Sequence, residues 1–400
     1  MNAPDIREKF LKYFEDRGHT RFPSASLVPT DPGVLLTMAG MLPFKPYFLG
    51  TEHAPSPRIT SVQKCVRTSD IEHVGNTARH HTFFEMLGNF SFGDYFKREA
   101  IQWAFEWLTK EVGLDTSRLS MAVFREDEEA YGIWSEELGI GKERIFRLDE
   151  DNNFWSAGPT GPCGPCSEIY WDLGKEFGCG KPTCGPGCDC DRFLEIWNLV
   201  FMEYNRDSAG KLEPLPKKNV DTGMGLERIA SVLQGVRSNF ETDLFMPLIE
   251  WVRGASSNTP DEKKRIRAER IIVDHVRAAV FLLGDGVTPA NDGRGYILRR
   301  LIRRAVDQGE RLGISKKPFL PDLARTVFAL GKAAYPDVLL HQHLIEQYLQ
   351  SEEVKFRETL EDGEYVIKKF SDRGRRSGNI TVSGADAVGI FSTYGIPLEI

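Results

Sequence analysis

The chain has 400 residues, with a hydrophobic content of 41%, a charged content of 27% and a formal net charge of −7. This length exceeds one typical core, so we expect two or three domains of an ordinary globular protein. The net charge argues against a nonspecific nucleic-acid coat but leaves room for a local basic face. The chain opens on the polar stretch MNAPDIREKF and holds no apolar run near the roughly 20 residues that a membrane span requires. We therefore expect a cytoplasmic protein without membrane contact.

The first half of the chain mixes helix and strand patterns. Residues 4–17 form an amphipathic helix pattern, 22–57 are punctuated by proline and glycine, and 58–67 alternate as in a strand. A second strand is predicted over 78–87, so that 58–87 would form an antiparallel pair. Beyond it, the sequence predicts a helix over 97–112, strands over 119–127 and 193–205, and a strand end, glycine turn and helix over 220–235.

The character of the sequence changes after about residue 240, where strand patterns give way to helix patterns until residues 379–384. The polar, loop-like stretch 237–262 supplies a boundary. The expected fold class is α+β, with an antiparallel sheet flanked by helices in residues 1–240. A mainly helical domain is expected in residues 241–400.

Six of the seven cysteines lie between Cys163 and Cys190. In a cytosolic protein such clustering favours metal binding or catalysis over disulfides. Four of them share one glycine-rich loop at the spacing of a closed tetrahedral zinc site, namely Cys179, Cys184, Cys188 and Cys190. Free thiols are the alternative. Cys163 and Cys166 are expected to pack without metal, although either could complete the zinc site.

The aromatic and basic stretch RHHTFFEMLGNFSFGDYFK begins at Arg79. Because side chains alternate between the faces of a strand, one face is predicted to carry Arg79, His81, Phe83 and Glu85. Arg67 on the partner strand can join that face. Two guanidiniums beside an aromatic ring suit a nucleotide, since arginine forks bind phosphate and a ring stacks on adenine. A half-buried strand with incidental charges is the alternative.

A glycine-rich segment, DTGMGLERIA, follows later in the chain. Gly223 and Gly225 would let a ligand approach the backbone closely. Arg228 falls in the first turn of the predicted helix, where a cation is unfavourable to the helix dipole, so an anionic partner is expected.

Together these three segments resemble the motifs of the class II aminoacyl-tRNA synthetases, and more closely those of the alanyl-tRNA synthetase family. The resemblance rests on RHHTFFEMLGNFSFGDYFK, TGPCGPCSEI, EIWNLVFM, VDTGMGLERIA and RGYILRRLIRRA, in that family's order, and covers essentially the whole chain. It implies a ligase that activates alanine with ATP as alanyl-adenylate. The alanine would then be transferred to the 3′ end of tRNA(Ala).

The resemblance also implies a role for each motif residue at the nucleotide. Arg67 matches the family's α-phosphate arginine, while Arg79 and Arg228 would hold the β/γ end. Phe83 would stack on adenine, with Arg228 covering the other face. The other expected ATP-site residues are His81, Glu85 and Gly225. Mg²⁺ is expected on the phosphates, because it bridges oxygens as charge develops.

Alanine recognition resembles that of the family at Trp155, Asn198, Val200, Asp221 and Gly223. Asp221 would pair with the α-ammonium, and Asn198 would hydrogen-bond the polar end of the substrate. Trp155 and Val200 would wall the methyl pocket, where Gly223 leaves room. Because a pocket discriminates one methylene by only about 1–3 kcal/mol and rejects an added hydroxyl poorly, glycine and serine are the expected errors.

The segment RGYILRRLIRRA stacks four arginines at helical spacing, namely Arg299, Arg300, Arg303 and Arg304. A solvated charged face is the usual explanation for such a run. In a chain of net negative charge, the concentration favours contact with RNA phosphates. Asn291 resembles the family's residue that reads the G·U pair of the tRNA acceptor stem, so the helical domain is expected to recognise that stem.

Three differences from the family bear on tRNA. The loop after Arg67, TSDIEHVG, is short and lacks the family's Gly-Lys-His-Asn, and Ser392 stands where aspartate is usual. The paired histidine and cysteine motifs of the family's editing site are absent from this sequence. We therefore expect a chain that lacks the editing and C-terminal domains and accumulates seryl-tRNA when given serine and ATP.

Two other functions stay open. One is a non-catalytic, synthetase-like RNA-binding protein, which loss of Arg67, Arg79 or Arg228 would have favoured; all three are present. The other is an enzyme that activates alanine with ATP for an acceptor other than tRNA, against which the basic helix and Asn291 count.

Overall fold

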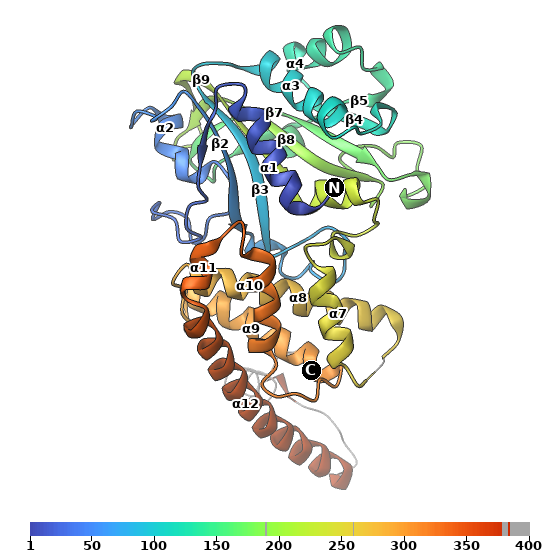
Figure 1. The fold of residues 1–400 in the computed structure, drawn as a ribbon. Helices are drawn as coiled ribbons and strands as arrows, with labels where there is room; N and C mark the ends of the chain where they lie inside the picture. The colour runs from blue at the N-terminus through green and yellow to red at the C-terminus, as the bar shows by residue number, and fades with distance from the viewer. Residues whose placement is uncertain (189, 259, 378–382, 385–400) are drawn as a thin grey trace. The chain divides into compact units, whose positions relative to one another are not determined.

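The computed structural model describes residues 1–188, 190–258, 260–377 and 383–384 (Figure 1). The chain divides into two compact units, Met1–Pro247 and Leu248–Ile400. The first unit is built on a sheet flanked by helices and the second on helices, which confirms the α+β fold class. Within the described ranges, no helix is long and apolar enough to cross a membrane.

One sheet runs through the described part of the first unit, with its strands in the order β1-β2-β3-β9-β8-β7-β4-β5 and β6 paired to β7. Neighbouring strands are antiparallel except at the two ends of this order, where β1 pairs with β2 and β4 with β5 in parallel. The strands are β1 (Thr20–Phe22), β2 (Arg58–Val66), β3 (Phe83–Phe92), β4 (Leu119–Phe124), β5 (Ile145–Leu148), β6 (Phe154–Ser156), β7 (Gly161–Asp172), β8 (Phe193–Arg206) and β9 (Leu212–Gly225).

The predicted antiparallel pair over 58–87 is present as β2 and β3, but β3 begins five residues later than the predicted 78–87. Cys65 lies opposite Phe84 in the ladder, and the Arg67 amide donates to the Thr82 carbonyl at 2.9 Å. Opposite residues in such a ladder share a face. Arg67 therefore lies on the face of Phe84 rather than that of Phe83.

The sequence reading missed β7, which runs between β8 and β4 in the sheet. Its first half, GPCGPC, contains two prolines, a residue that normally argues against an interior strand. The ladder to β8 is irregular between Cys163 and Cys166. At Gly164 a Cβ would lie only 1.9 Å from the Phe201 carbonyl oxygen, so the close approach of these strands requires glycine.

Helices of the first unit pack on this sheet, and α1 shows why they form. Asn2 caps α1 by accepting from the Asp5 amide at 2.8 Å, and the apolar stripe includes the buried Phe10. The Phe10 ring contacts Trp107 and Trp197, with centroids 5.7 and 5.6 Å apart. The α-helices are α1 (Ala3–Glu15), α2 (Lys45–Leu49), α3 (Lys97–Glu106), α4 (Glu128–Gly132), α5 (Glu150–Asn153) and α6 (Leu226–Gln234).

Short helical turns fill several connections of the first unit. The 3₁₀ turns are Leu42–Phe44, Thr68–Asp70, Thr116–Arg118, Lys142–Arg144, Lys175–Phe177 and Asn239–Glu241, and the π turns are Trp107–Glu111 and Ile133–Glu137. The glycine turn expected within 220–235 is not a separate element, because β9 runs to Gly225 and α6 begins at the next residue.

In the second unit, α8 is buried on nearly every side along its second half, as expected of a central helix. The helices α9, α10 and α12 pack against α8. The helices are α7 (Met246–Ala255), α8 (Glu262–Gly284), α9 (Gly293–Arg311), α10 (Leu320–Gly331), α11 (Pro336–Leu340) and α12 (Gln342–Ser377). The strand pattern noted at 379–384 lies almost entirely outside the described residues.

Candidate active site

A cavity of about 220 Å³ lies over the face of the sheet formed by β7, β8, β9, β3 and the end of β2. It brings together every residue expected at the ATP and alanine sites except Phe83 and Glu85. These lining residues are Arg67, Arg79, His81, Trp155, Asn198, Val200, Asp221, Gly223, Gly225 and Arg228. Segments more than 150 residues apart in the chain thus meet at one concave site.

Three arginines line the cavity together with five acidic residues, namely Asp70, Glu168, Glu195, Asp221 and Glu227. The Arg67 Nε donates to the Met38 carbonyl at 3.2 Å, and its guanidinium lies 5.0 Å from the centre of the Phe84 ring. Arg79 comes within 3.5 Å of the Asp191 carboxylate. Because the three guanidiniums line one cavity, they could bind a polyanion together.

Arg228 has the anionic partner that its place in the first turn of α6 predicted. Its Nη1 donates to the Glu195 carboxylate at 3.0 Å and to the Glu195 carbonyl at 2.9 Å. Glu195 therefore fixes the direction in which this guanidinium points.

The expectation that Phe83 and Glu85 line the cavity is wrong. Phe83 is fully buried on the opposite face of β3, and Phe84 lines the cavity in its place. Glu85 is only 1% exposed, and its carboxylate accepts hydrogen bonds from Nε and Nη2 of Arg7, each at 2.7 Å. The error arose because residues 79–82 precede the strand, so the alternation of faces begins only at Phe83.

The two adjacent histidines have different surroundings. The His81 ring stacks on Phe245 at 4.8 Å, and its Nε2 lies 3.1 Å from the Asn239 side-chain amide. Burial lowers the pKa of His80 to about 4, and its Nδ1 lies 2.8 Å from the Thr77 hydroxyl. His81 thus lines the cavity as a packed, oriented ring, and His80 is neutral at physiological pH.

The side of the cavity where alanine is expected combines the Asp221 carboxylate, the Asn198 amide and the space at Gly223. Burial raises the pKa of Asp221 to about 7. Asn198 donates from Nδ2 to the Glu168 carboxylate at 2.9 Å. At Gly223 a Cβ would come within 2.8 Å of the Met86 sulfur, so a side chain here would have to displace the Met86 thioether. The arrangement suits a small ammonium-bearing ligand.

Sequence reasoning missed several residues that line the cavity, namely Asp70, Phe84, Met86, Glu168 and Glu195. Burial, then the neighbouring Glu195 charge, raises the pKa of Glu168 to about 8. Strand alternation from the observed start of β3 would have found Phe84 and Met86. Glu168 lies in the motif TGPCGPCSEI, where prolines hid the strand.

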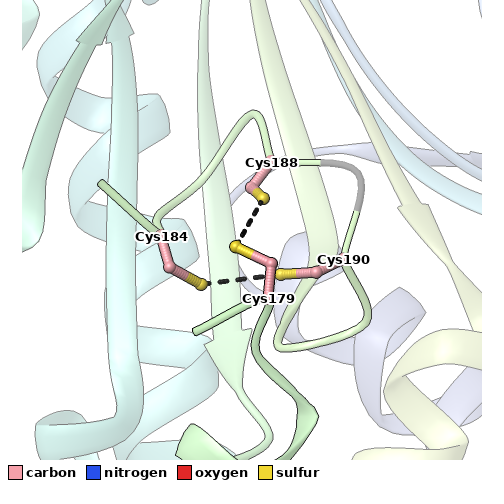
Figure 2. Close-up of side chains that lie close together, drawn as sticks. All are labelled: Cys179, Cys184, Cys188 and Cys190. Atoms are coloured by element: carbon pink, nitrogen blue, oxygen red, sulfur yellow. Dashed lines mark hydrogen bonds between the residues drawn. The ribbon is translucent and has the colours of Figure 1, made fainter. Parts of the chain in front are cut away.

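The four loop cysteines converge as predicted, with their sulfurs turned toward one another (Figure 2). All four sulfur atoms lie within 4.8 Å of one another, with Cys179 to Cys188 at 3.6 Å and Cys184 to Cys190 at 3.5 Å. Thiolates 2.3 Å from a tetrahedral zinc would lie about 3.8 Å apart. The cluster is thus compatible with zinc, whereas Cys163 and Cys166 are buried in β7 and lie outside it.

At least three of the four arginines predicted to bind RNA on α9 contact other side chains of the protein. Arg299 and Arg303 each contact the buried Glu352 carboxylate, at 3.0 and 3.1 Å. The Arg304 Nε donates to His275 at 3.2 Å. Asn291 is exposed just before α9, and its side-chain oxygen accepts from Arg299. Arg300 is half-buried on the same helix.

Of the two sequence differences noted after Arg67 and near the end of the chain, the structure describes only the first. The short loop TSDIEHVG contains the turn Thr68–Asp70, and Asp70 lines the cavity. Ser392 lies outside the described residues.

The chain resembles known proteins in sequence. It is 53% identical to the alanine–tRNA ligase of Desulfitobacterium hafniense (strain Y51), over 99% of this chain and 45% of that protein. It is 54% identical to the alanine–tRNA ligase of Synechococcus sp. (strain JA-2-3B'a(2-13)), over 100% of this chain and 46% of that protein. The chain thus spans less than half the length of these relatives.

Among solved structures, the pyrrolysyl-tRNA synthetase of Desulfitobacterium hafniense matches 60% of this chain and 72% of its own, with a TM-score of 0.35 and 14% identity. The apo histidyl-tRNA synthetase of S. aureus matches 63% of this chain and 78% of its own length, with a TM-score of 0.35 and 10% identity. The family model for class II tRNA synthetases (A) matches residues 5–400, and the chain therefore belongs to that family.

Proposed function

We propose that this chain activates alanine with ATP and transfers it to the 3′ end of tRNA(Ala). The observation that supports it most is the cavity, where three arginines lie beside a small pocket lined by a carboxylate and an amide. In the first step an oxygen of the alanine carboxylate attacks the α-phosphorus. The bond to the bridging oxygen breaks, and pyrophosphate leaves with the electron pair. In the second, a terminal ribose hydroxyl of the tRNA attacks the carbonyl, and AMP leaves.

The arginines would supply most of the catalysis, because this chemistry needs positioning and charge neutralisation more than a protein nucleophile. Arg67 is assigned to the α-phosphate, and Arg79 and Arg228 to the β/γ end. Phe84, beside the Arg67 guanidinium, replaces Phe83 as the ring proposed for adenine. Gly225 leaves the backbone open there, and the packed ring of His81 supports the wall.

Alanine would bind on the other side of the cavity. Asp221 would pair with its α-ammonium, while Trp155 and Val200 would wall the space beside Gly223 for its methyl group. Such a pocket excludes larger side chains by overlap but rejects glycine and serine only weakly.

Two metals belong to the proposal. Mg²⁺, when bound, would be held by carboxylate oxygens such as those of Asp70 and Glu195, and it would neutralise the negative charge that develops on the phosphates. Zn²⁺ would be held by the four loop cysteines, whose sulfur spacing fits a closed site with no open position for substrate. Its role would therefore be structural.

Recognition of the tRNA acceptor stem is assigned to the second unit. Asn291 is exposed, and because Arg299 occupies its oxygen, its amide N–H groups are left to donate to a base edge. Arg299, Arg300, Arg303 and Arg304 would add phosphate contacts. Binding would have to compete with Glu352 for Arg299 and Arg303. A cytoplasmic location is part of this proposal, because the tRNA substrate is there.

The test is charging of tRNA(Ala) by the purified chain with ATP and labelled alanine. We expect alanyl-tRNA, and much less product with an acceptor stem in which the G·U pair is replaced by G·C. Adenylate formation without transfer to any tRNA would favour an alanine-activating enzyme with another acceptor. Binding of tRNA with neither step would favour a non-catalytic RNA-binding protein.

A further inference from the structure

The cysteine loop (residues 178–188 and 190–192) reaches the cavity at Arg79. Arg79 Nη1 donates to the carbonyl oxygen of Cys190 at 3.4 Å and lies 3.5 Å from the Asp191 carboxylate. Cys190 is one of the four cysteines whose sulfurs converge, and Arg79 lines the cavity. A direct contact therefore joins the predicted metal ligands to a side chain assigned to the β/γ-phosphates.

The main chain and the guanidinium of Arg79 are held by different parts of the protein. The Asn239 backbone N–H donates to the Ala78 carbonyl at 3.1 Å, and the Asn239 side-chain amide donates to the Arg79 carbonyl at 3.3 Å. These bonds fix where the side chain starts but not where it ends. Among the described residues, Arg79 Nε and Nη2 have no hydrogen-bond or ion-pair partner, so the polar contacts at Nη1 orient the guanidinium.

The position of Cys190 depends on the convergence of the four sulfurs (Figure 2). The base of the loop is anchored separately, because Arg192 donates two hydrogen bonds to Asp172 at 2.9 and 2.6 Å. The sulfurs of Cys184 and Cys190 lie 3.5 Å apart, a contact that thiols hold only weakly and that a shared zinc ion would fix. Metal binding at such a site supplies folding free energy to the segment around it.

We propose that the cysteine loop positions Arg79 for the β/γ-phosphates of ATP, so that metal held by the four cysteines strengthens ATP binding. The inference rests on the proposed function, which places ATP in this cavity. Ordering a long side chain on binding costs affinity, and a guanidinium that is already directed avoids part of that cost. Both contacts to Nη1 are long, so we expect a several-fold change in ATP affinity.

The first experiment removes one metal ligand. Cys179→Ser should lower the zinc content and raise the Kd for ATP, measured by calorimetry with Mg²⁺ and without alanine, about 2- to 10-fold. KM for ATP in ATP–pyrophosphate exchange should rise in parallel, while KM for alanine changes less than about twofold. Thr183→Ala is the matched control, because Thr183 is exposed in the same loop. In an Arg79→Ala background, Cys179→Ser should add little to the Kd for ATP.

A second experiment leaves the four cysteines intact. The Asp191 side chain is 58% exposed, and by charge alone its removal should strengthen binding of the polyanionic ATP. Asp191→Ala should instead raise KM for ATP about 2- to 5-fold, as expected when Arg79 loses an exposed ion pair that directs it. Asp191→Asn keeps an acceptor for Nη1 and should stay within about twofold of wild type.

The proposal is overturned if zinc-depleted Cys179→Ser, still folded by circular dichroism, binds ATP as tightly as wild type. An undiminished effect of Cys179→Ser in the Arg79→Ala background would also overturn it, as would a lower KM for ATP in Asp191→Ala. If Cys179→Ser does not fold or keeps its zinc, the Asp191 variants decide alone. Wild-type protein that binds ATP but shows no alanine-dependent exchange would instead contradict the proposed function.

Discussion

Replacing Gly223 by alanine should damage alanine activation through a single steric contact. The added Cβ would lie 2.8 Å from the Met86 sulfur, 3.3 Å from its Cγ and 3.4 Å from its Cε. Optimal contacts between non-bonded heavy atoms lie at about 3.5–4.0 Å, so the thioether must move by about 0.7 Å. The Gly40 amide donates to that sulfur at 3.1 Å and holds it in place. Gly223 does not have positive φ, so the backbone accepts alanine without strain.

The magnitude follows from overpacking, which typically costs about 1–3 kcal/mol. If this cost falls on the bound substrate, kcat/KM for alanine in ATP–pyrophosphate exchange should fall about 5- to 150-fold. Glycine, which lacks the methyl group, should lose less, so the ratio of glycine to alanine activation should rise. Gly132→Ala is the matched control, because its Cβ would meet nothing within 4 Å.

A second control tests whether Met86 is the cause. In a Met86→Ala background the contact is gone, so adding Gly223→Ala should cost far less than it does in wild type. The steric reasoning is refuted if Gly223→Ala stays within threefold of wild type on alanine. It is equally refuted if the Met86→Ala background gives no relief.

Four further predictions concern two residues of the cavity, the cysteine loop and Asn291 of the second unit. Arg67→Ala should slow exchange about 100- to 1,000-fold, as when about 2.7–4 kcal/mol of transition-state stabilisation is lost; activity within tenfold of wild type would remove Arg67 from its role. Because the pKa of Asp221 is raised to about 7, its carboxylate predominates only above that pH. As the pH is lowered below about 7, kcat/KM for alanine should therefore decrease, with a slope that approaches tenfold per pH unit. A kcat/KM that stays constant from pH 5.5 to 8 would exclude Asp221 as the ammonium partner. Elemental analysis should give about one zinc per chain, because one closed site takes four thiolates; a metal-free, fully active and equally stable protein would refute the site. Asn291→Ala should lower kcat/KM for tRNA charging about 5- to 150-fold, from about 1–3 kcal/mol of base discrimination, while exchange without tRNA stays unchanged; equal loss in both assays would contradict a role in tRNA reading.

Strand patterns and motif order predicted much of the site because residues at fixed positions on neighbouring strands must meet. Asn198 lies opposite Gly223 in the ladder between β8 and β9, so both reach the same cavity. The convergence of the four loop cysteines also followed from local spacing alone.

The errors have local causes that sequence alone does not reveal. The start of β3 decided whether Phe83 or Phe84 faced the cavity, and a shift of one residue exchanges the two faces of a strand. Glu168 stayed hidden because a strand with two prolines does not read as one. The pairing of Arg299 and Arg303 with Glu352 joins residues about 50 positions apart, and no periodicity within α9 predicts it.

The most direct measurement is ATP–pyrophosphate exchange with each of the twenty amino acids, using the purified chain with Mg²⁺ and no tRNA. We predict strong exchange with alanine, weaker exchange with glycine and serine, and none above background with larger side chains, because the pocket proposed beside Gly223 would hold little more than a methyl group. Absence of alanine-dependent exchange, or a preference for a larger amino acid, would contradict the assignment of this cavity to alanine activation.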